Sequence, residues 1–366
     1  MKKYAGVIMG LLLLVTNGHA SYFNTDRPQK IMGSLLTEAW QVDEIRGFSN
    51  AFAFIPKTPG EIIDYLNINQ YGLLTVISID KLLFDRERGL YHADTRAIMQ
   101  AIHDASRQGD EMLFMLDEPL WTVRNACMAG KKAACDDIEN GYTETLATLR
   151  TVGQQLRQEF PGSGVMHIEA WTELVLQKKK HPDANVIMLD DVEYLGFDCY
   201  GKFDRCGSDE YGYYSQLEFG IEVWNTLHAL EADNPIGRKI FLIPGAFLNE
   251  RFFQNTDEIK EQLFRHAQLL DQYDKVAGFG IFLWGDMMEN DQVFQGARGL
   301  QAVVDYIIEI AGYFKIGYRE VVDNNVTTLN GNLSIGNLKQ QTEVVFPQFQ
   351  EALEQIKETL SGLFLD

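Results

Sequence analysis

The sequence predicts a (β/α)8 barrel, and three observations support this fold class. The chain has 366 residues, of which 46% are hydrophobic, so it can bury a large core. Eight short segments are apolar throughout, as expected of parallel strands that are buried on both faces. Amphipathic segments with apolar residues at every third or fourth position lie between most of them. Strands that alternate with helices eight times are typical of this barrel.

The expected strands are short apolar runs that cover residues 31–36, 50–55, 73–79, 112–116, 165–168, 194–197, 239–243 and 279–283. The expected helices cover residues 58–67, 94–107, 143–159, 216–231, 257–273 and 299–311. The pattern is incomplete, because few residues separate the first two strands and residues 172–191 have a weak helical pattern. A doubly wound open sheet is therefore the alternative. No Gly-x-Gly-x-x-Gly segment or phosphate-binding loop supports it.

The chain ends predict two segments outside the barrel. Residues 1–20 combine a short positive start, an apolar run and the small-x-small sequence Gly18-His19-Ala20, which together indicate a signal peptide. We therefore expect a secreted or periplasmic protein with a barrel over residues 21–314; an uncleaved membrane anchor is the alternative. Residues 315–366 predict a polar loop and a C-terminal helix, over 342–364, that packs on the barrel.

The charge of the chain excludes one class of partner. Acidic residues outnumber basic ones by 52 to 32, which gives a net charge of −20. A surface this negative repels phosphate backbones, so we expect no nucleic-acid binding. No later apolar run is long enough to cross a bilayer, so no membrane association is expected after cleavage of the signal peptide.

Four cysteines form two groups of close neighbours in the sequence. In an oxidising compartment this spacing favours the local disulfides Cys127–Cys135 and Cys199–Cys206. A zinc site is the alternative. Neither group has Cys-x-x-Cys spacing or a nearby histidine, which argues against zinc.

Carboxylates and tryptophans recur at the expected carboxyl ends of the strands, where barrels of this class carry their chemistry. These segments are Thr37-Glu38-Ala39-Trp40, Asp117-Glu118-Pro119-Leu120-Trp121, His167-Ile168-Glu169-Ala170-Trp171, Asp198-Cys199-Tyr200 and Trp284-Gly285-Asp286. The flat apolar face of tryptophan suits the C–H faces of sugar rings. The alternative for each tryptophan is a place in the core. The recurrence favours a carbohydrate ligand.

Three of these segments resemble clan A glycoside hydrolases over roughly residues 31–312. Met115-Leu116-Asp117-Glu118-Pro119 is similar to the Asn-Glu-Pro signature of the clan, with Asp in place of Asn. Leu283-Trp284-Gly285 is similar to the substrate-contacting tryptophan of the clan. Gly196-Phe197-Asp198-Cys199-Tyr200 resembles an aromatic strand end of many sugar-cleaving barrels. The resemblance implies that Glu118 is the general acid/base.

The chain departs from the clan at the seventh strand. The clan places its nucleophilic glutamate there, whereas this chain has Ile243-Pro244-Gly245-Ala246-Phe247, and the nearest acid is Glu250. Chitinase-type barrels have Asp-x-Glu at the fourth strand, which the adjacent Asp117 and Glu118 do not match. A second carboxylate must therefore come from another strand, or the protein is not a glycosidase.

Glycoside cleavage commonly needs one protonated and one ionised carboxyl group. We expect Glu118 to be the acid, with Glu169 as its first candidate partner and Asp198 as the second. Since successive strand residues point to opposite faces, Asp117 and Glu118 would diverge if the strand continued past them. The residues expected to bind substrate are Glu38, Trp40, Asp117, Trp121, His167, Trp171, Tyr200, Trp284 and Asp286.

Other chemistries have less support in the sequence. A divalent metal could bind His167 and Glu169 with Asp117 and Asp198, but only one histidine falls at a strand end. No Gly-x-Ser-x-Gly turn indicates a serine hydrolase. The sequence thus predicts a cofactor-independent hydrolase of oligo- or polysaccharides. A non-catalytic carbohydrate-binding barrel for polysaccharide capture or export is the alternative.

Overall fold

The computed structural model describes residues 30–107, 109–180, 187–198, 200, 238–272, 274–289 and 291–316. Several predicted features lie outside these residues: the signal peptide, the Cys199–Cys206 disulfide, the helix over 216–231 and the segment from 317 to the C-terminus with its helix.

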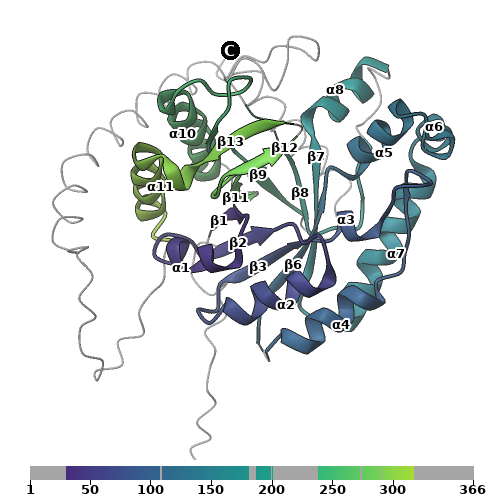
Figure 1. The fold of residues 1–366 in the computed structure, drawn as a ribbon, viewed down its shortest axis with the longest axis horizontal. Helices are drawn as coiled ribbons and strands as arrows, with labels where there is room; N and C mark the ends of the chain where they lie inside the picture. The colour runs from purple at the N-terminus through teal and green to yellow at the C-terminus, as the bar shows by residue number, and fades with distance from the viewer. Residues whose placement is uncertain are drawn as a thin grey trace, which may run out of the picture.

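Eight parallel strands close into a barrel, and helices surround it (Figure 1). Around the barrel the strands follow the order β1 (Ile31–Leu36), β11 (Val276–Ile281), β9 (Lys239–Ile243), β8 (Tyr194–Asp198), β7 (Gly164–Ala170), β6 (Met112–Asp117), β3 (Leu74–Ser78) and β2 (Ala51–Phe54). Pairing of β2 with β1 completes the ring. The predicted (β/α)8 barrel is confirmed, and closure of the sheet excludes the open doubly wound alternative.

The helices of the described residues are α1 (Val42–Ile45), α2 (Pro59–Ile68), α3 (Asp80–Leu83), α4 (Arg96–Ala105), α5 (Pro119–Met128), α6 (Lys132–Glu139), α7 (Thr143–Glu159), α8 (Trp171–Lys180), α10 (Thr256–Gln272) and α11 (Gln301–Tyr313), with 3-10 turns η1 (Ala39–Gln41) and η2 (Ala297–Gly299). Strands β4 (Phe84–Asp85) and β5 (Leu90–Tyr91) pair with each other, and β10 (Phe247–Leu248), β13 (Gln292–Gly296) and β12 (Met287–Glu289) form a second small sheet. Among these helices, none is long and apolar enough to cross a membrane.

Strand β11 begins three residues before its predicted start at Phe279. Its first three residues, Val276-Ala277-Gly278, include two small residues, so the hydrophobic pattern of the sequence is weak there. The close approach of β1 explains the glycine: a Cβ atom at Gly278 would lie 2.1 Å from the backbone oxygen of Ile31. The close packing of β11 on β1 thus requires a glycine, and this glycine weakens the hydrophobic pattern by which the strand is recognised in the sequence.

Alternate residues of all eight strands fill the barrel interior. The interior cluster consists of Ile31, Ala51, Val76, Leu113, Met115, Met166, Ile168, Tyr194, Phe241 and Ala277. The residues between them, such as Phe52 and Phe114, pack instead in the layer between barrel and helices. This alternation assigns a face to each residue near the carboxyl ends of the strands.

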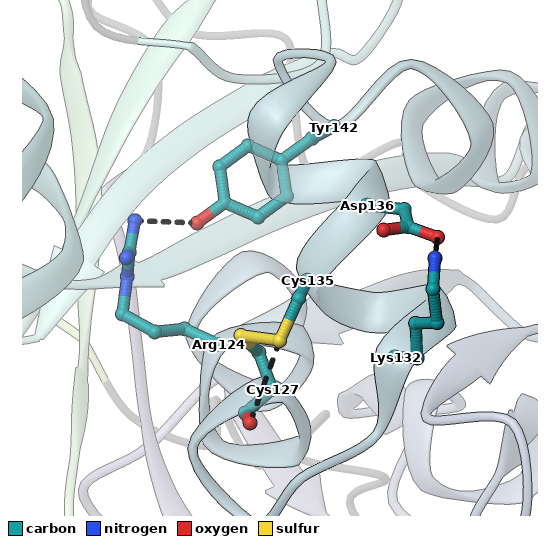
Figure 2. Close-up of a disulfide and its surroundings, with 6 residues drawn as sticks. All are labelled: Arg124, Cys127, Lys132, Cys135, Asp136 and Tyr142. Carbon is teal, nitrogen blue, oxygen red and sulfur yellow. Dashed lines mark hydrogen bonds and ion pairs between the residues drawn. A yellow bond between two sulfur atoms is a disulfide. The ribbon is translucent and has the colours of Figure 1, made fainter.

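A disulfide joins the end of α5 to α6 (Figure 2). Cys127 lies in α5 and Cys135 in α6, with 4.7 Å between their Cα atoms. The predicted local pairing of these two cysteines is confirmed. Since α5 begins directly after Glu118, the bond constrains the helix that follows the predicted acid.

We expect the double variant Cys127→Ser/Cys135→Ser to unfold at a lower temperature. Closing a loop of this length restricts the unfolded chain and contributes roughly 2–3 kcal/mol, equivalent to about 3–5 °C in Tm for a barrel of this size. Calorimetry under non-reducing conditions measures the shift, with Met128→Ser, an exposed change at the end of the same helix, as the control. Equal melting temperatures for all three proteins would contradict the expectation.

Candidate functional site

Four carboxyl groups gather at the carboxyl ends of β3, β6 and β8. Asp117 is the last residue of β6 and Asp198 the last of β8, and both follow interior residues at two-residue spacing. The alternation of strand residues therefore directs both side chains inward. Asp80 follows β3, and Glu118 follows Asp117. The arrangement concentrates acid at the end of the barrel where catalytic residues occur.

Glu118 has a left-handed backbone conformation, with φ of 52°. Its amide N–H donates to the carbonyl oxygen of Ile168 in β7 at 2.7 Å, and its carbonyl accepts the first hydrogen bond of α5, from Thr122, at 2.9 Å. A non-glycine residue in this conformation costs on the order of 1–3 kcal/mol, and such strain concentrates at functional sites. The strand ends before Glu118, so the condition under which Asp117 and Glu118 would diverge is not met.

Glu118 and Asp198 form a hydrogen-bonded carboxyl pair. Burial raises the pKa of Glu118 well above its usual range, and the charges of Asp198 and Asp117 raise it further. Burial also raises the pKa of Asp198 to about 7, opposed by hydrogen bonds from Glu118 and Tyr200. Burial and the neighbouring charges therefore favour a proton on the pair, and Glu118 donates the hydrogen bond to Asp198.

Asp80 is a third carboxyl group with a high pKa. Burial raises its pKa from 3.8 to about 7, and the charge of Asp117 adds to the effect. The Ser78 hydroxyl donates a hydrogen bond to Oδ1 of Asp80 at 2.6 Å, and Lys81 also favours the charged form. Asp117 thus supplies negative charge to three neighbouring acids, which places it at the electrostatic centre of the cluster.

His167 and Glu169 lie on the outward face of β7. They alternate with Met166 and Ile168, which point into the barrel interior. Both side chains are fully buried. The carboxylate of Glu169 accepts hydrogen bonds from backbone amides of α5 and from the ring of His167, at 3.0–3.1 Å. The two residues therefore contact the helix layer rather than the barrel interior, where substrate binding was expected of His167.

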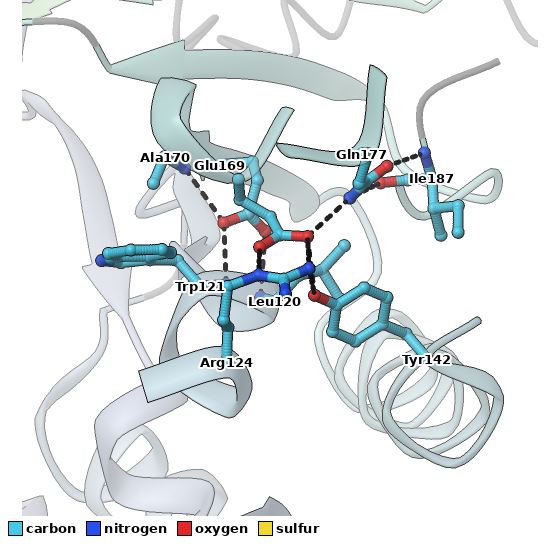
Figure 3. Close-up of polar contacts among 9 residues, drawn as sticks. Leu120, Trp121, Arg124, Tyr142, Glu169, Ala170, Gln177 and Ile187 are labelled. Atoms are coloured by element: carbon cyan, nitrogen blue, oxygen red, sulfur yellow. Dashed lines mark hydrogen bonds and ion pairs between the residues drawn. The ribbon is translucent and has the colours of Figure 1, made fainter. Parts of the chain in front are cut away.

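A buried ion-pair network that the sequence analysis missed links α5 to α8. Arg124 in α5 donates to both carboxylate oxygens of Glu173 and to the hydroxyl of Tyr142, and Tyr142 donates to Glu173 at 2.6 Å. Gln177 donates to the same carboxylate at 3.1 Å (Figure 3). Helical periodicity could have placed these residues on buried faces, but no spacing in the sequence indicates which of them meet.

The four tryptophans at strand ends divide into two groups. Trp171 and Trp284 are 6% and 3% exposed, and the indole N–H of Trp284 donates to Glu44 at 2.9 Å. These two side chains belong to the core, which was the alternative for each tryptophan. Trp121 is partly buried, and Trp40 is 46% exposed with the Arg298 guanidinium 4.7 Å from its ring centroid. Trp40 and Trp121 thus remain accessible for a ligand.

The other predicted binding residues are Glu38, Asp286 and Tyr200. Glu38 and Asp286 are exposed, after β1 and β11 respectively, and Asp286 accepts a hydrogen bond from the Gly296 amide at 3.0 Å. Tyr200 is partly buried and donates to Asp198. Of these three residues, only Tyr200 contacts the Glu118–Asp198 pair directly.

The carboxyl end of β9 has no acidic side chain from Pro244 to Leu248. It lies instead in an aromatic cluster of Tyr200, Phe247, Phe252, Phe253, Phe282 and Phe294, whose neighbouring ring centroids are 4.9–6.3 Å apart. The amide of Gly245 donates to the side chain of Gln262 at 2.6 Å. Among the residues that the structure describes, no group of three or more His, Cys, Asp or Glu side chains is arranged to hold a metal ion.

The fold is similar to those of solved glycoside hydrolases. A family 1 β-glucosidase from Thermotoga maritima has a TM-score of 0.50 and 11% sequence identity, and the match covers 76% of this chain and 85% of that one. Two β-glucuronidases, from Dictyoglomus thermophilum and Ruminococcus gnavus, have TM-scores of 0.46 and 0.47 at 15% and 13% identity, over 78% of this chain. This chain spans about half of their length (51% and 50%).

Comparisons of the sequence with protein-family models and with curated proteins find no match. The structural likeness to the β-glucosidase concerns the barrel fold, since the identity is low. It agrees with the (β/α)8 architecture that the alternation of strands and helices predicted.

We expect Asp80→Asn to reduce the pH dependence of stability between about pH 4 and 7. The pKa of Asp80 is higher in the folded chain, so the contribution of Asp80 to the free energy of unfolding is largest below pH 4 and decreases as the pH rises towards 7. Removing this group reduces the slope by up to about 1.36 kcal/mol per pH unit. Denaturant titrations at pH 4–8 measure it.

The exposed Asp64 in α2 provides the matched control, Asp64→Asn. In Asp64→Asn, the slope of the free energy of unfolding against pH should equal that of the unchanged protein. If Asp80→Asn had the same slope as the control, the buried carboxyl cluster would not carry the pH dependence.

Proposed function

We propose that this protein is a glycoside hydrolase with Glu118 as its general acid. The observation that carries the proposal is the Glu118–Asp198 pair: a carboxyl group with a raised pKa, held in a left-handed turn, beside a second carboxyl group at the carboxyl end of a barrel. General acids of glycosidases need a raised pKa so that they can protonate the departing glycosidic oxygen.

Asp198, rather than Glu169, is the carboxyl group that acts on Glu118. A direct hydrogen bond brings the two groups closer than the roughly 5–5.5 Å of a retaining pair or the roughly 6.5–9.5 Å of an inverting pair, so Asp198 holds the proton on Glu118 rather than attacking the sugar. The oxygens of Glu169 are occupied by backbone amides and by His167, and the side chain points away from the barrel interior. Asp198 points inward, contacts Glu118 and has a pKa of about 7. Its charge keeps the proton on Glu118, and Asp117 adds negative charge that stabilises a developing oxocarbenium ion.

The proposed substrate is an oligo- or polysaccharide outside the cytoplasm. Trp40 and Trp121 supply accessible aromatic faces at opposite parts of the barrel end, after β1 and β6. The N-terminal signal pattern supports a secreted or periplasmic location, and the Cys127–Cys135 disulfide agrees with an oxidising compartment.

A non-catalytic carbohydrate-binding barrel is the second candidate, and one observation favours it. The end of β9 holds an aromatic cluster and no carboxylate, so the usual position of a clan nucleophile is occupied by packing. Such a protein would bind sugar polymers without releasing reducing ends, for capture or export of a polysaccharide.

We expect Glu118→Gln to lower sugar release from the responsive member of a polysaccharide panel by about 10²–10⁴-fold, because a general acid contributes this much. Reducing-end assays on the purified protein measure the loss. Glu111→Gln, a carboxyl change at the amino end of β6, should retain activity. Unchanged hydrolysis in Glu118→Gln would refute the assignment; polymer binding without release in every variant would support the binding barrel.

Activity should rise with pH through about 7 and fall again at higher pH. The rising limb reflects ionisation of Asp198, and the falling limb reflects loss of the proton from Glu118, whose pKa is higher. Initial rates across pH 5–10 test this, and Asp198→Asn should abolish the rising limb. A profile that declines from pH 5 onward would contradict the roles given to the pair.

We expect Trp40→Ala to raise KM with little change in kcat. Loss of an exposed aromatic platform removes about 0.5–1.5 kcal/mol of binding, or roughly 2- to 10-fold in KM. Steady-state kinetics with the responsive polymer measure the change. Met288→Ala, which shortens an exposed apolar side chain on β12, is the control and should leave KM unchanged.

A further inference from the structure

We propose that Glu169 is a positioning residue, whose buried carboxylate fixes the first turn of α5 on β7 and so holds Glu118 in the conformation that directs its carboxyl group to Asp198. The proposal rests on the proposed function, because it concerns the same acid. It assigns to Glu169 a role that requires no contact with substrate.

The contacts of Glu169 span the junction between β7 and α5 (Figure 3). Oε2 accepts the amide N–H of Leu120 at 3.0 Å, and Oε1 accepts that of Trp121 at 3.1 Å. Oε1 also accepts the amide of Ala170, at 3.0 Å. The amides of Leu120 and Trp121 belong to the first turn of a ten-residue helix, where N–H groups have no partner within the helix. The Glu169 carboxylate thus accepts hydrogen bonds from two of these N–H groups, and its position at the helix N-terminus is favourable for a negative group because the helix dipole is positive there.

His167 fixes the orientation of the carboxylate. Its Nδ1 accepts the amide N–H of Leu189 at 3.1 Å, so the hydrogen of the neutral ring lies on Nε2. Nε2–H then donates to Oε2 of Glu169 at 3.1 Å. All four groups around Glu169 therefore donate hydrogen bonds to its carboxylate oxygens. Since both side chains are fully buried, neither can turn towards water without opening the layer between barrel and helices.

The hydrogen bonds of Glu169 hold α5, and the residue directly before this helix is Glu118. Its left-handed φ is unfavourable for a side chain with a Cβ atom, and Pro119 follows it. The turn is fixed from both sides: Ile168 in β7 accepts the amide of Glu118, and Glu169, the next residue of β7, binds the helix. Without the carboxylate, two amides lose their acceptor and the strained turn can relax.

The charge of Glu169 also acts on the carboxyl pair. The ionisable groups that face Glu118 are Asp117 at the end of β6, Asp198 on β8, Glu169 on β7 and Tyr200 after β8. Tyr91 and Tyr142 also lie within the electrostatic range of Glu169. Removal of its charge should therefore make Glu118 easier to ionise, in addition to any movement of the turn.

Glu169→Gln tests the proposal, because it keeps the shape of the side chain and removes the charge and one acceptor. We expect kcat to fall roughly 10- to 100-fold with KM nearly unchanged, as for a misplaced catalytic group. The falling limb of the pH profile should move to lower pH. Glu173→Gln is the matched control: it removes an equally buried carboxylate that binds Arg124 and not the first turn of α5. It should destabilise the fold without moving the limb.

A second measurement needs no substrate. In protein labelled with [δ-13C]glutamate, the titration of Glu118 is assigned by its absence in Glu118→Gln and followed by NMR. Its midpoint should shift to lower pH in Glu169→Gln and stay in place in Glu173→Gln. This result with no hydrolysis of any polymer would support the positioning role and refute the proposed function. Hydrolysis with an unmoved titration and an unchanged kcat in Glu169→Gln would overturn the positioning role alone.

If Glu169→Gln does not fold, His167→Gln replaces it in the same measurement. Loss of the ring that orients Glu169 should move the Glu118 midpoint in the same direction by a smaller amount. An unchanged midpoint in this variant would overturn the proposal.

Discussion

Closure of the sheet into a barrel is the constraint on which the site depends. It brings the ends of β3, β6 and β8 to one place and lets strand alternation direct Asp117 and Asp198 into it. Burial and mutual repulsion there raise the pKa values of Asp80, Glu118 and Asp198. The raised pKa values of Glu118 and Asp198 are a consequence of this geometry. The fold thus sets the chemistry of the site before any substrate enters.

The α5 region shows how much structure surrounds one acid. The helix is held at its first turn by Glu169, in its middle by the pair of Arg124 with Glu173, and at its end by the Cys127–Cys135 disulfide. A buried ion pair adds little net stability compared with apolar packing, but it defines one geometry for the helices that it joins. Three different kinds of contact thus fix the position of a ten-residue helix.

The strands could be predicted because each is buried on both faces and therefore continuously apolar; β1 and β9 have the predicted bounds. The acids at the strand ends could be located for the same reason. The roles within the site could not. A left-handed turn at Glu118 has no sequence signal beyond the following proline. Whether Glu169 points into the barrel or away from it would be reversed by a shift of one residue along β7. The buried indole N–H of Trp284 finds its acceptor in Glu44, which is distant in sequence.

The end of β9, which has no acidic side chain, is packed tightly around Gly245. A Cβ atom at this residue would lie 2.7 Å from Phe253, 3.0 Å from Phe247 and 3.1 Å from Tyr200. A larger residue at position 245 would therefore require movement of three aromatic rings at the same time. The end of β9 is committed to packing, whereas the ends of β6 and β8 hold carboxyl groups.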